Sequence, residues 1–238
     1  MRQVPSYAII GNGRMAKHIR YYLSQLGLAH LQWHRPQSTQ SLHKIIEQSS
    51  HILLLITDRN IDRFFIEHLT DYQHNKVFVH FSGALMSSYI SSAHPLQTFS
   101  TQTYPLSTYQ SIPFIIEQQG PSFQQLLPGF PNQHYAIPRN KKPYYHALCV
   151  LANNFTTLIW QKFFTSMQEH FSLPQKDLQP YLQQTLHNLT HDYSHALTGP
   201  FARHDHLTLE KNLQALQQDN YQKIFKAFID TYLTEKNL

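Results

Sequence analysis

The 238-residue sequence contains one cysteine, little charge and no long apolar run. The lone Cys149 excludes a disulfide within the chain and is typical of proteins from reducing compartments. No apolar stretch approaches the roughly 20 residues of a membrane-spanning helix, since the most apolar one, at 52–56, has the length of a strand. Residues 1–6 lead into a strand-like run without the apolar segment of a secretory signal. These absences predict a cytoplasmic protein that does not bind a membrane.

Acidic residues are fewer than basic ones, which gives a formal net charge of +5 and an isoelectric point near 9.2. Many nucleic-acid-binding proteins have such a balance, but they gather their cations in a dense patch. Here the basic residues are scattered, and the only tight group is Arg139, Lys141 and Lys142. We interpret this group as a solvated face and expect no nucleic-acid partner. The positive balance would also suit an anionic cofactor.

Short apolar runs alternate with helical patterns in the first half of the chain. The predicted strands cover 6–11, 31–35 (closed by Pro36), 51–57, 76–82 and 113–117. Predicted helices cover 14–26, which Gly27 ends, and 41–48, and a third carries Ile61, Phe64, Phe65 and Leu69 on one side. Because the apolar strands lack a clean period of two, we expect a parallel sheet that is covered on both faces.

The pattern changes near Tyr135, and no convincing strand follows Pro143. A long helix is predicted over 143–170 and a second over 178–197, with two more starting at the N-cap candidates Thr208 and Asp219. The sequence therefore predicts an α/β domain over 1–138 and an all-helical domain over 139–238.

A glycine motif joins the first predicted strand to the first predicted helix. Residues 11–16 read Gly-Asn-Gly-Arg-Met-Ala, in which Gly11 permits a tight turn, Gly13 admits a pyrophosphate near the backbone, and Ala16 lets the helix pack on the sheet. The helix N-terminus presents free N–H groups to phosphates. We therefore assign Gly11, Asn12, Gly13, Arg14, Met15 and Ala16 to cofactor binding and the sheet to the Rossmann-type, doubly wound class.

The end of the second strand indicates which dinucleotide binds. An NAD site usually has an acidic residue there for the ribose 2′-hydroxyl, but the first acidic residue of this chain is Glu47. The strand ends in His34 and Arg35, and a guanidinium can bind a 2′-phosphate. NADP is therefore the predicted cofactor, and the alternative is that Arg35 is a solvated strand end.

Several motifs resemble known proteins. Residues 9–19, Ile-Ile-Gly-Asn-Gly-Arg-Met-Ala-Lys-His-Ile, resemble the opening of pyrroline-5-carboxylate reductases. Further segments resemble Rossmann-like, NADP-dependent oxidoreductase-like proteins with a C-terminal helical domain of unknown function; they lie at 57–61, 80–84, 94–99, 145–147, 153–155 and 196–205. One position departs from that group, because His204 stands where it usually has glycine.

The resemblance implies a fold and a cofactor class but no particular reaction. It places Thr57 and Asp58 in the cofactor site. It also implies a helical domain like that of 6-phosphogluconate dehydrogenases, through which relatives commonly form homodimers.

His94 and Ser82 are the first candidates for catalysis. His94 belongs to a His-Pro segment beyond the fourth main strand, near the sheet edge where such folds bind ligands. Ser82 and His94 are similar to the serine and histidine of prephenate dehydrogenases, where the histidine contacts the reacting hydroxyl. The alternative is a loop histidine whose proline only fixes the chain.

His146 is the second candidate. Asn153 lies seven residues later and shares its helix face, and related dehydrogenases place a catalytic lysine and an asparagine on this helix. We find no such lysine on this face, so His146 would take its place, with Asn153 or Asn154 orienting the substrate. A structural, hydrogen-bonded histidine is the alternative.

The loop at 198–205 contains the remaining candidates. Thr198, Arg203 and Asp205 are assigned to substrate binding, with Arg203 on a carboxylate or phosphate. Alternatively, an Arg203–Asp205 link only stiffens the loop. The row of His187, His191 and His195 has metal-ligand spacing, but no cysteine completes it and we expect no metal. Cys149, among apolar neighbours, is interpreted as a buried small hydrophobe.

These observations favour an NADP(H)-dependent oxidoreductase that acts by hydride transfer on a small, anionic or carbonyl-bearing metabolite. A homodimer formed through the helical domain is expected. The alternative is a nicotinamide-nucleotide-binding sensor or scaffold without catalysis. A third interpretation, nucleic-acid binding through the basic surface, is disfavoured by the scattered charges.

Overall fold

The structure is a computed structural model that describes residues 6–35 and 37–235. Pro36, which the sequence places at the end of the second strand, lies outside the described residues. The chain divides into two compact units, Met1–Ile159 and Trp160–Leu238. The predicted boundary at 138/139 instead marks the point where the sheet has ended and helices begin.

Seven strands form one sheet within the described residues of the first unit. Their order is β2-β1-β3-β4-β5-β6-β7, and every neighbouring pair is parallel except β5 and β6. The strands are β1 Ser6–Ile10, β2 Ala29–Trp33, β3 His51–Leu54, β4 Val77–His80, β5 Ser91–Pro95, β6 Phe114–Glu117 and β7 His134–Ile137.

Strands β5 and β7 are additions to the predicted set. Strand β5 reads Ser-Ser-Ala-His-Pro, so its burial comes from small and polar side chains that carry no apolar signal. Strand β7 lies at the sheet edge with mostly exposed side chains, and therefore needs no apolar pattern. A strand is recognised in a sequence by apolar side chains that are buried against a core, and neither β5 nor β7 has such a pattern.

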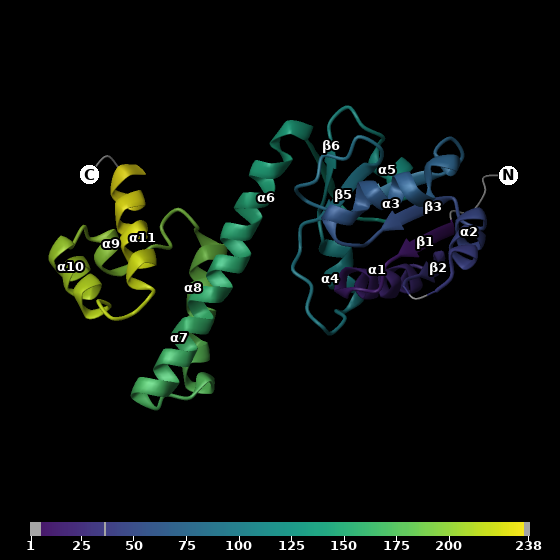
Figure 1. Ribbon diagram of the computed structural model, residues 1–238. Coiled ribbons are helices and arrows are strands. Elements are labelled where there is room, and N and C mark those ends of the chain that lie inside the picture. The colour runs from purple at the N-terminus through teal and green to yellow at the C-terminus, as the bar shows by residue number, and fades with distance from the viewer. Residues whose placement is uncertain (1–5, 36, 236–238) are drawn as a thin grey trace. The chain divides into compact units, whose positions relative to one another are not determined.

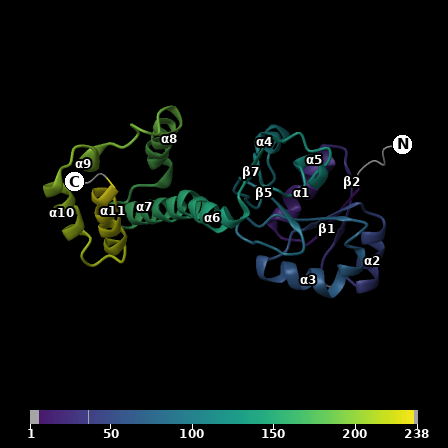
Figure 2. The ribbon, with the colours of Figure 1, turned by 90° about the horizontal axis from the view of Figure 1, so that it is seen from above.

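Helices cover both faces of the sheet. Figure 1 shows the sheet with its helices, and in Figure 2 α1, α4 and α5 lie on one side of it and α2 and α3 on the other. Along β1, Tyr7 and Ile9 enter one apolar cluster and Ala8 and Ile10 the other, so the strand is apolar throughout. The helices are α1 Arg14–Gln25, α2 Thr39–Glu47, α3 Ile61–His68, α4 Leu106–Ser111 and α5 Phe123–Leu126, with short 3₁₀ turns η1 Asp58–Asn60, η2 Thr70–Tyr72 and η3 Arg139–Lys141.

The strand order creates a switch point beside β1. The chain passes from β1 to β2 on one side and then returns to β3 on the other side of β1. In sheets of this kind, ligands bind outside the carboxyl ends of the strands at such a point. The fold thus confirms the predicted Rossmann-type α/β class followed by helices.

The predicted long helix at 143–170 is interrupted by a wider turn. Helix α6, Lys142–Val150, passes into the π-helical segment η4, Leu151–Phe155, and then into α7, Thr156–Phe171. Asn153 and Asn154 both lie in η4. Such π turns are rare and occur frequently at functional sites.

The second unit is helical, with boundaries that differ from the prediction. Helix α8 ends at His191 instead of 197, because the Asp192 carboxylate accepts hydrogen bonds from the Ser194 hydroxyl and the His195 ring in the turn that follows. The N-cap of α10 is Asp205, not Thr208. The helices are α8 Gln175–His191, α9 Gly199–Ala202, α10 His206–Ala215 and α11 Gln222–Glu235.

His204 occupies a backbone conformation that favours glycine. Its φ of 53° lies in the left-handed region, which costs a non-glycine residue roughly 1–2 kcal/mol. The chain therefore carries backbone strain at His204.

The helices of the second unit bury almost none of their side chains. Among the described residues after Ile159, Leu209 alone is buried. Helices α7 and α8 contain no buried residue. Within the described part of the chain, no helix is both long and apolar enough to cross a membrane.

Candidate functional site

A cavity of about 590 Å³ lies at the carboxyl ends of β1, β2 and β3. Helix α3 supplies another part of its lining through Arg63, Phe64, Glu67 and His68. The predicted cofactor residues that line it are Gly11, Asn12, Gly13, Arg14, Met15, His34, Arg35 and Thr57. The structure thus brings together most of the residues that were assigned to cofactor binding.

The two glycines serve this cavity in different ways. Gly11 has a φ of +133°, and a Cβ at this position would lie 2.3 Å from the Leu55 carbonyl oxygen, so no other residue fits. Gly13 is the N-cap of α1, and a Cβ there would meet nothing within 4 Å. No side chain caps the helix, and Ala16 is buried against the sheet. The free first turn of α1 and the open space at Gly13 fit a phosphate group.

The charge of the lining is predominantly positive. Arg14, Arg35 and Arg63 all reach the cavity, whereas Glu67 is the one carboxylate in its lining. Arg63 Nε donates to Glu67 Oε1 at 2.7 Å, and this hydrogen bond is the main cause that lowers the pKa of Glu67. Arg35 is exposed at the end of β2. The lining therefore fits an anionic ligand such as a dinucleotide phosphate.

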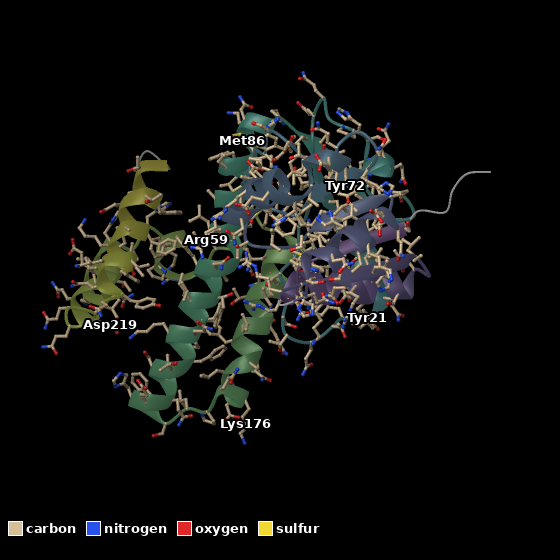
Figure 3. The ribbon with its side chains drawn as sticks, turned by 45° about the vertical axis from the view of Figure 1, so that its right-hand side comes forward. Tyr21, Arg59, Tyr72, Met86, Lys176 and Asp219 are labelled. Atoms are coloured by element: carbon tan, nitrogen blue, oxygen red, sulfur yellow. The ribbon has the colours of Figure 1, made fainter. Side chains whose placement is uncertain are left out.

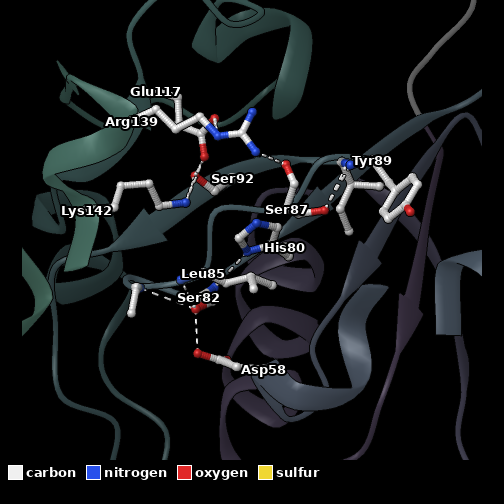
Figure 4. A network of polar contacts seen from close by, with 12 residues as sticks. Asp58, His80, Ser82, Leu85, Ser87, Tyr89, Ser92, Glu117, Arg139 and Lys142 are labelled. Carbon is white, nitrogen blue, oxygen red and sulfur yellow. Dashed lines mark hydrogen bonds and ion pairs between the residues drawn. The ribbon is translucent and has the colours of Figure 1, made fainter. Parts of the chain in front are cut away.

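Asp58 and Ser82 lie outside the lining of this cavity. Ser82 Oγ donates to Asp58 Oδ2 at 2.5 Å and accepts from the backbone N–H groups of Ala84 and Leu85 at 3.3 and 3.0 Å (Figure 4). The Ser82 hydroxyl was assigned to catalysis and the Asp58 carboxylate to cofactor binding, but both groups are hydrogen-bonded to protein groups here. In this structure both side chains hold the turn that carries Gly83.

A second cavity of about 370 Å³ brings together four of the predicted residues. His94, His146, Asn153 and Asn154 all line it. His94 lies on β5 and not in a loop, and the π turn η4 contributes both asparagines. The rest of the lining is Leu96, Gln97, Thr98, Cys149, Val150 and Ala152. The described lining has no carboxylate, ammonium or guanidinium group.

The two histidines converge on Gly83. Their ring centroids are 5.6 Å apart, and His94 Nδ1 lies 2.8 Å from the Tyr145 hydroxyl. A Cβ on Gly83 would lie 2.5 Å from His146 Nδ1 and 3.0 Å from His94 Nε2. His146 Nδ1 is buried without a hydrogen-bond partner among the described residues. The half-buried Cys149 lines the same cavity, so its interpretation as a fully buried hydrophobe is wrong.

A buried ion pair lies beside these histidines, and the sequence analysis missed it. Lys142 is 3% exposed and donates to Glu117 Oε1 at 2.8 Å and to Ser92 Oγ at 2.6 Å (Figure 4). Arg139 Nε lies 3.8 Å from Glu117 Oε2, and the guanidinium also donates to the Ser87 carbonyl.

Two statements about the basic group are thereby corrected. Lys142 is buried against Glu117 and does not belong to a solvated face, whereas Arg139, near the same carboxylate, is 44% exposed and Lys141 is exposed as well. A lysine is also present on the His146 face of α6, because Lys142 lies four residues earlier. Two features of the sequence could have indicated this ion pair. One is the four-residue spacing of Lys142 and His146, and the other is the acid Glu117 that ends the apolar run Phe-Ile-Ile-Glu.

Burial keeps two histidines of this region neutral. Burial lowers the pKa of His80 to about 3, helped by the charges of Lys142, Arg139 and His94. Burial also lowers the pKa of His94 to about 4, helped by His146 and Lys142. His80 Nδ1 accepts from the Ser82 N–H at 3.2 Å, whereas its Nε2 has no partner within the described residues.

The loop at 198–205 belongs to the second unit. Thr198 is the N-cap of α9, and the Asp205 carboxylate caps α10 by accepting from the Thr208 N–H and hydroxyl. These hydrogen bonds, more than the charge of Arg203, lower the pKa of Asp205. The Arg203 side chain makes no hydrogen bond or ion pair to another described residue.

Other clusters contain no predicted site residue. His187 and His191 stack at 4.1 Å, whereas His195 bonds to Asp192, and no three metal-ligating side chains converge within the described residues. A cavity of about 660 Å³ lies between residues 86–91, 117–120 and 138–140. It is larger than the other two cavities, but neither the glycine motif nor the pair His94 and His146 lines it.

The comparison with protein families identifies the second half of the chain. Residues 112–231 match the family described as "Domain of unknown function (DUF2520)", and this match spans just over half of the chain. The chain belongs to this family. The DUF2520 segment includes Lys142, His146 and Asn153 but neither Gly11 nor His94. No functionally curated protein matches the sequence.

Solved structures share the fold over nearly the full chain. A candidate NADP oxidoreductase from Bacteroides fragilis has a TM-score of 0.71 at 18% identity, over 96% of this chain and 97% of that one. A protein from Thermotoga maritima has 0.64 at 21% identity, over 97% and 99%. The NADP-bound pyrroline carboxylate reductase of Plasmodium falciparum has 0.58 at 10% identity, over 96% and 99%. The resemblance inferred from the motifs is thereby confirmed at the level of the fold.

We expect acid to destabilise the fold between about pH 6.5 and pH 4. His80 and His94 titrate near 6.5 in an unfolded chain, whereas their folded pKa values are lowered to about 3 and 4. The unfolded chain therefore binds more protons in this interval, and the free energy of unfolding falls with pH by roughly 1–3 kcal/mol for each histidine. Urea unfolding followed by circular dichroism from pH 7 to pH 4 measures this.

The control is the double variant His80→Gln/His94→Gln, which lacks both titrating rings. Its free energy of unfolding should depend on pH less steeply than that of the natural chain. An equal slope in the two proteins would contradict the assignment of the acid sensitivity to this pair.

Proposed function

We propose that this chain is an NADP(H)-dependent oxidoreductase that reduces or oxidises a small metabolite by hydride transfer. The observation that carries the proposal is the cationic cavity at the switch point, where Gly13 leaves open space before the uncapped first turn of α1. The fold shared with NAD(P)-dependent reductases supports it. A bound nicotinamide would supply or accept the hydride.

The residues of the first cavity would hold the cofactor by its charged groups. The N–H groups that follow Gly13 would receive the pyrophosphate, and the Arg35 guanidinium would bind the 2′-phosphate. Arg63 lines the same cavity and adds a second guanidinium, already oriented by Glu67. A ribose-binding acid at the end of β2 is absent, since His34 and Arg35 stand there, which favours NADP over NAD.

Variants of the two glycines separate an effect on folding from an effect on cofactor binding. Gly13→Ala should fold, because its Cβ meets open space, but should lower NADPH affinity at least about tenfold by obstructing the phosphate. Gly11→Ala should fail to fold normally, because its Cβ would collide with the Leu55 carbonyl. Fluorescence titration gives the Kd, and thermal unfolding gives the stability.

The 2′-phosphate assignment is tested on Arg35 in the same assay. Arg35→Glu should weaken NADPH about ten- to a hundredfold and NADH much less, since a charge-assisted hydrogen bond is worth roughly 1.5–3 kcal/mol. Arg59→Glu makes the same charge change at an exposed position outside the cavity and serves as the matched control. Equal losses in the two variants, or a preference of the natural chain for NADH, would reject the assignment.

The second cavity supplies the groups for proton transfer and substrate positioning. Hydride transfer to a carbonyl or imine needs a proton donor or acceptor near the reacting atom. His94 and His146 converge there, and Asn153 and Asn154 can orient a polar substrate.

Turnover should depend on the histidines independently of cofactor binding. A panel of 2-keto acids, imines and 2-hydroxy acids is mixed with NADPH or NADP, and the near-ultraviolet absorbance of the reduced nicotinamide is followed. His94→Ala and His146→Ala should each lower kcat/KM by about 10²–10⁴-fold while leaving the Kd for NADPH within a factor of two or so. Tight NADPH binding without turnover of any compound would favour a sensor or scaffold.

We also propose a homodimer formed through the helical unit. Its helices bury almost nothing by themselves, and α8 exposes Leu186 and Leu189 by 50% and 48%. Exposed apolar side chains that form a contiguous patch often mark a surface that a partner covers. Figure 3 draws the side chains that project from the helices of this unit, from Lys176 near the start of α8 to Asp219 before α11.

Light scattering should give about twice the chain mass of 28.0 kDa. Leu186→Glu/Leu189→Glu should shift the protein toward the single-chain mass, because a carboxylate resists burial in an interface. Ile66→Glu places the same charge on a side chain that is 53% exposed on α3 of the first unit, and should leave the mass unchanged. A single-chain mass for the natural protein at micromolar concentration would contradict the proposal.

A further inference from the structure

Lys142 is a buried cation next to the candidate proton-transfer group. It lies one helical turn before His146 on α6, and its ammonium is bonded to Ser92 Oγ and Glu117 Oε1 (Figure 4). A buried ammonium is costly unless it is both paired and hydrogen-bonded. These two contacts therefore fix the position of the first turn of α6 on the sheet.

Strand β5 and helix α6 meet in two adjacent contacts. Ser92 and His94 are two residues apart and point to the same side of β5. Lys142 bonds to Ser92, and three residues later Tyr145 bonds to His94 Nδ1 at 2.8 Å. The contact made by Lys142 thus sets how the Tyr145 hydroxyl meets the His94 ring.

The same lysine leaves an excess of positive charge behind β5. One carboxylate, Glu117, faces the two cations Lys142 and Arg139, so the cluster has a net charge of +1. A positive charge in a buried setting opposes the protonation of a neighbouring imidazole. The ionisable groups around His94 are His80 on β4, Glu117 on β6, Arg139 on η3, and Lys142, Tyr145, His146 and Cys149 on α6.

We propose that Lys142 is a positioning residue that docks α6 on β5 and opposes protonation of the His94 ring. This role rests on the proposed function only in so far as His94 takes part in proton transfer. The lysine itself bonds to protein groups and is not among the residues that line the histidine cavity. A neutral His94 is able to accept a hydrogen bond or a proton from a substrate in the cavity.

The electrostatic direction agrees with this role. Burial, His146 and Lys142 together lower the pKa of His94, and Lys142 is also the largest charge effect on the pKa of His80. Burial lowers the pKa of Lys142 as well, while its hydrogen bond to Glu117 and the charge of that carboxylate oppose the change.

The test follows the His94 ring by NMR titration of the full-length protein without cofactor or substrate. The His94 resonance is assigned by its loss in His94→Gln. Lys142→Met should raise the midpoint of His94 by about one pH unit, a tenfold gain in proton affinity, because the cluster loses its net charge. Lys141→Met removes the same charge from the exposed neighbouring residue and should leave the midpoint in place.

Two further variants keep the test decisive. If Lys142→Met does not fold, Lys142→Gln replaces it, since its amide can still donate to Ser92 and Glu117 without the charge. Lys142→Arg retains the charge and should titrate like the natural chain. A midpoint that stays unchanged in the folded, uncharged variant, or that moves equally in Lys141→Met, would overturn the proposal.

The outcome is independent of the proposed reaction. If His94 titrates as expected but His94→Ala leaves turnover intact, the electrostatic role of Lys142 stands and the catalytic assignment of His94 fails. If turnover requires His94 but its titration midpoint does not change in Lys142→Met, the catalytic assignment of His94 stands and the electrostatic role of Lys142 fails. With a substrate in hand, the acidic limb of the kcat/KM profile should move to higher pH in Lys142→Met.

Discussion

Strand β1 pairs in parallel with β2 on one side and with β3 on the other, and the position of the first cavity depends on this pairing. This pairing brings together the carboxyl ends of β1, β2 and β3, which lie more than 20 positions apart in the sequence. Gly11 makes the close approach possible, because the Leu55 carbonyl occupies the space of a side chain there. Any larger residue would separate β1 from β3 where Gly13 begins α1.

The two cavities of the first unit differ in their electrostatics. The first gathers three guanidinium groups around an uncapped helix N-terminus and suits a ligand with several phosphates. The second has a lining without charged side chains, in which two half-buried imidazoles meet at Gly83. The Lys142–Glu117 pair lies beside the second cavity, so its charge acts on the histidines without reaching the ligand space. Such a division would let one region bind by charge while the other moves protons.

The described helices of the second unit leave most of their apolar side chains at least partly exposed. Among its described residues after Ile159 only Leu209 is buried, so packing within this unit leaves its apolar side chains largely uncovered. The DUF2520 match runs through this unit and into the last strands of the sheet, which indicates that the family unit is more than the helices. The strained His204 lies in the same region, at a turn where glycine would carry no such cost.

The sequence by itself determined the elements whose signals are local. The glycine motif, the apolar strands β1, β3 and β4, and the long helix from Lys142 follow from spacing and periodicity over a few residues. The convergence of Gly11, Arg35 and Thr57 could also be anticipated, because the carboxyl ends of parallel strands meet at one edge.

Only the tertiary structure decided the rest, because those contacts join residues that are far apart and carry no local signal. Strand β5 is polar and its pairing with β4 and β6 makes it a strand, which turns His94 from a loop residue into part of the sheet. The ion pair of Lys142 with Glu117 spans 25 positions, so a lysine that looked solvated in the sequence is buried in the structure. Charge patterns along a chain report composition, whereas burial and partners depend on which segments the fold brings together.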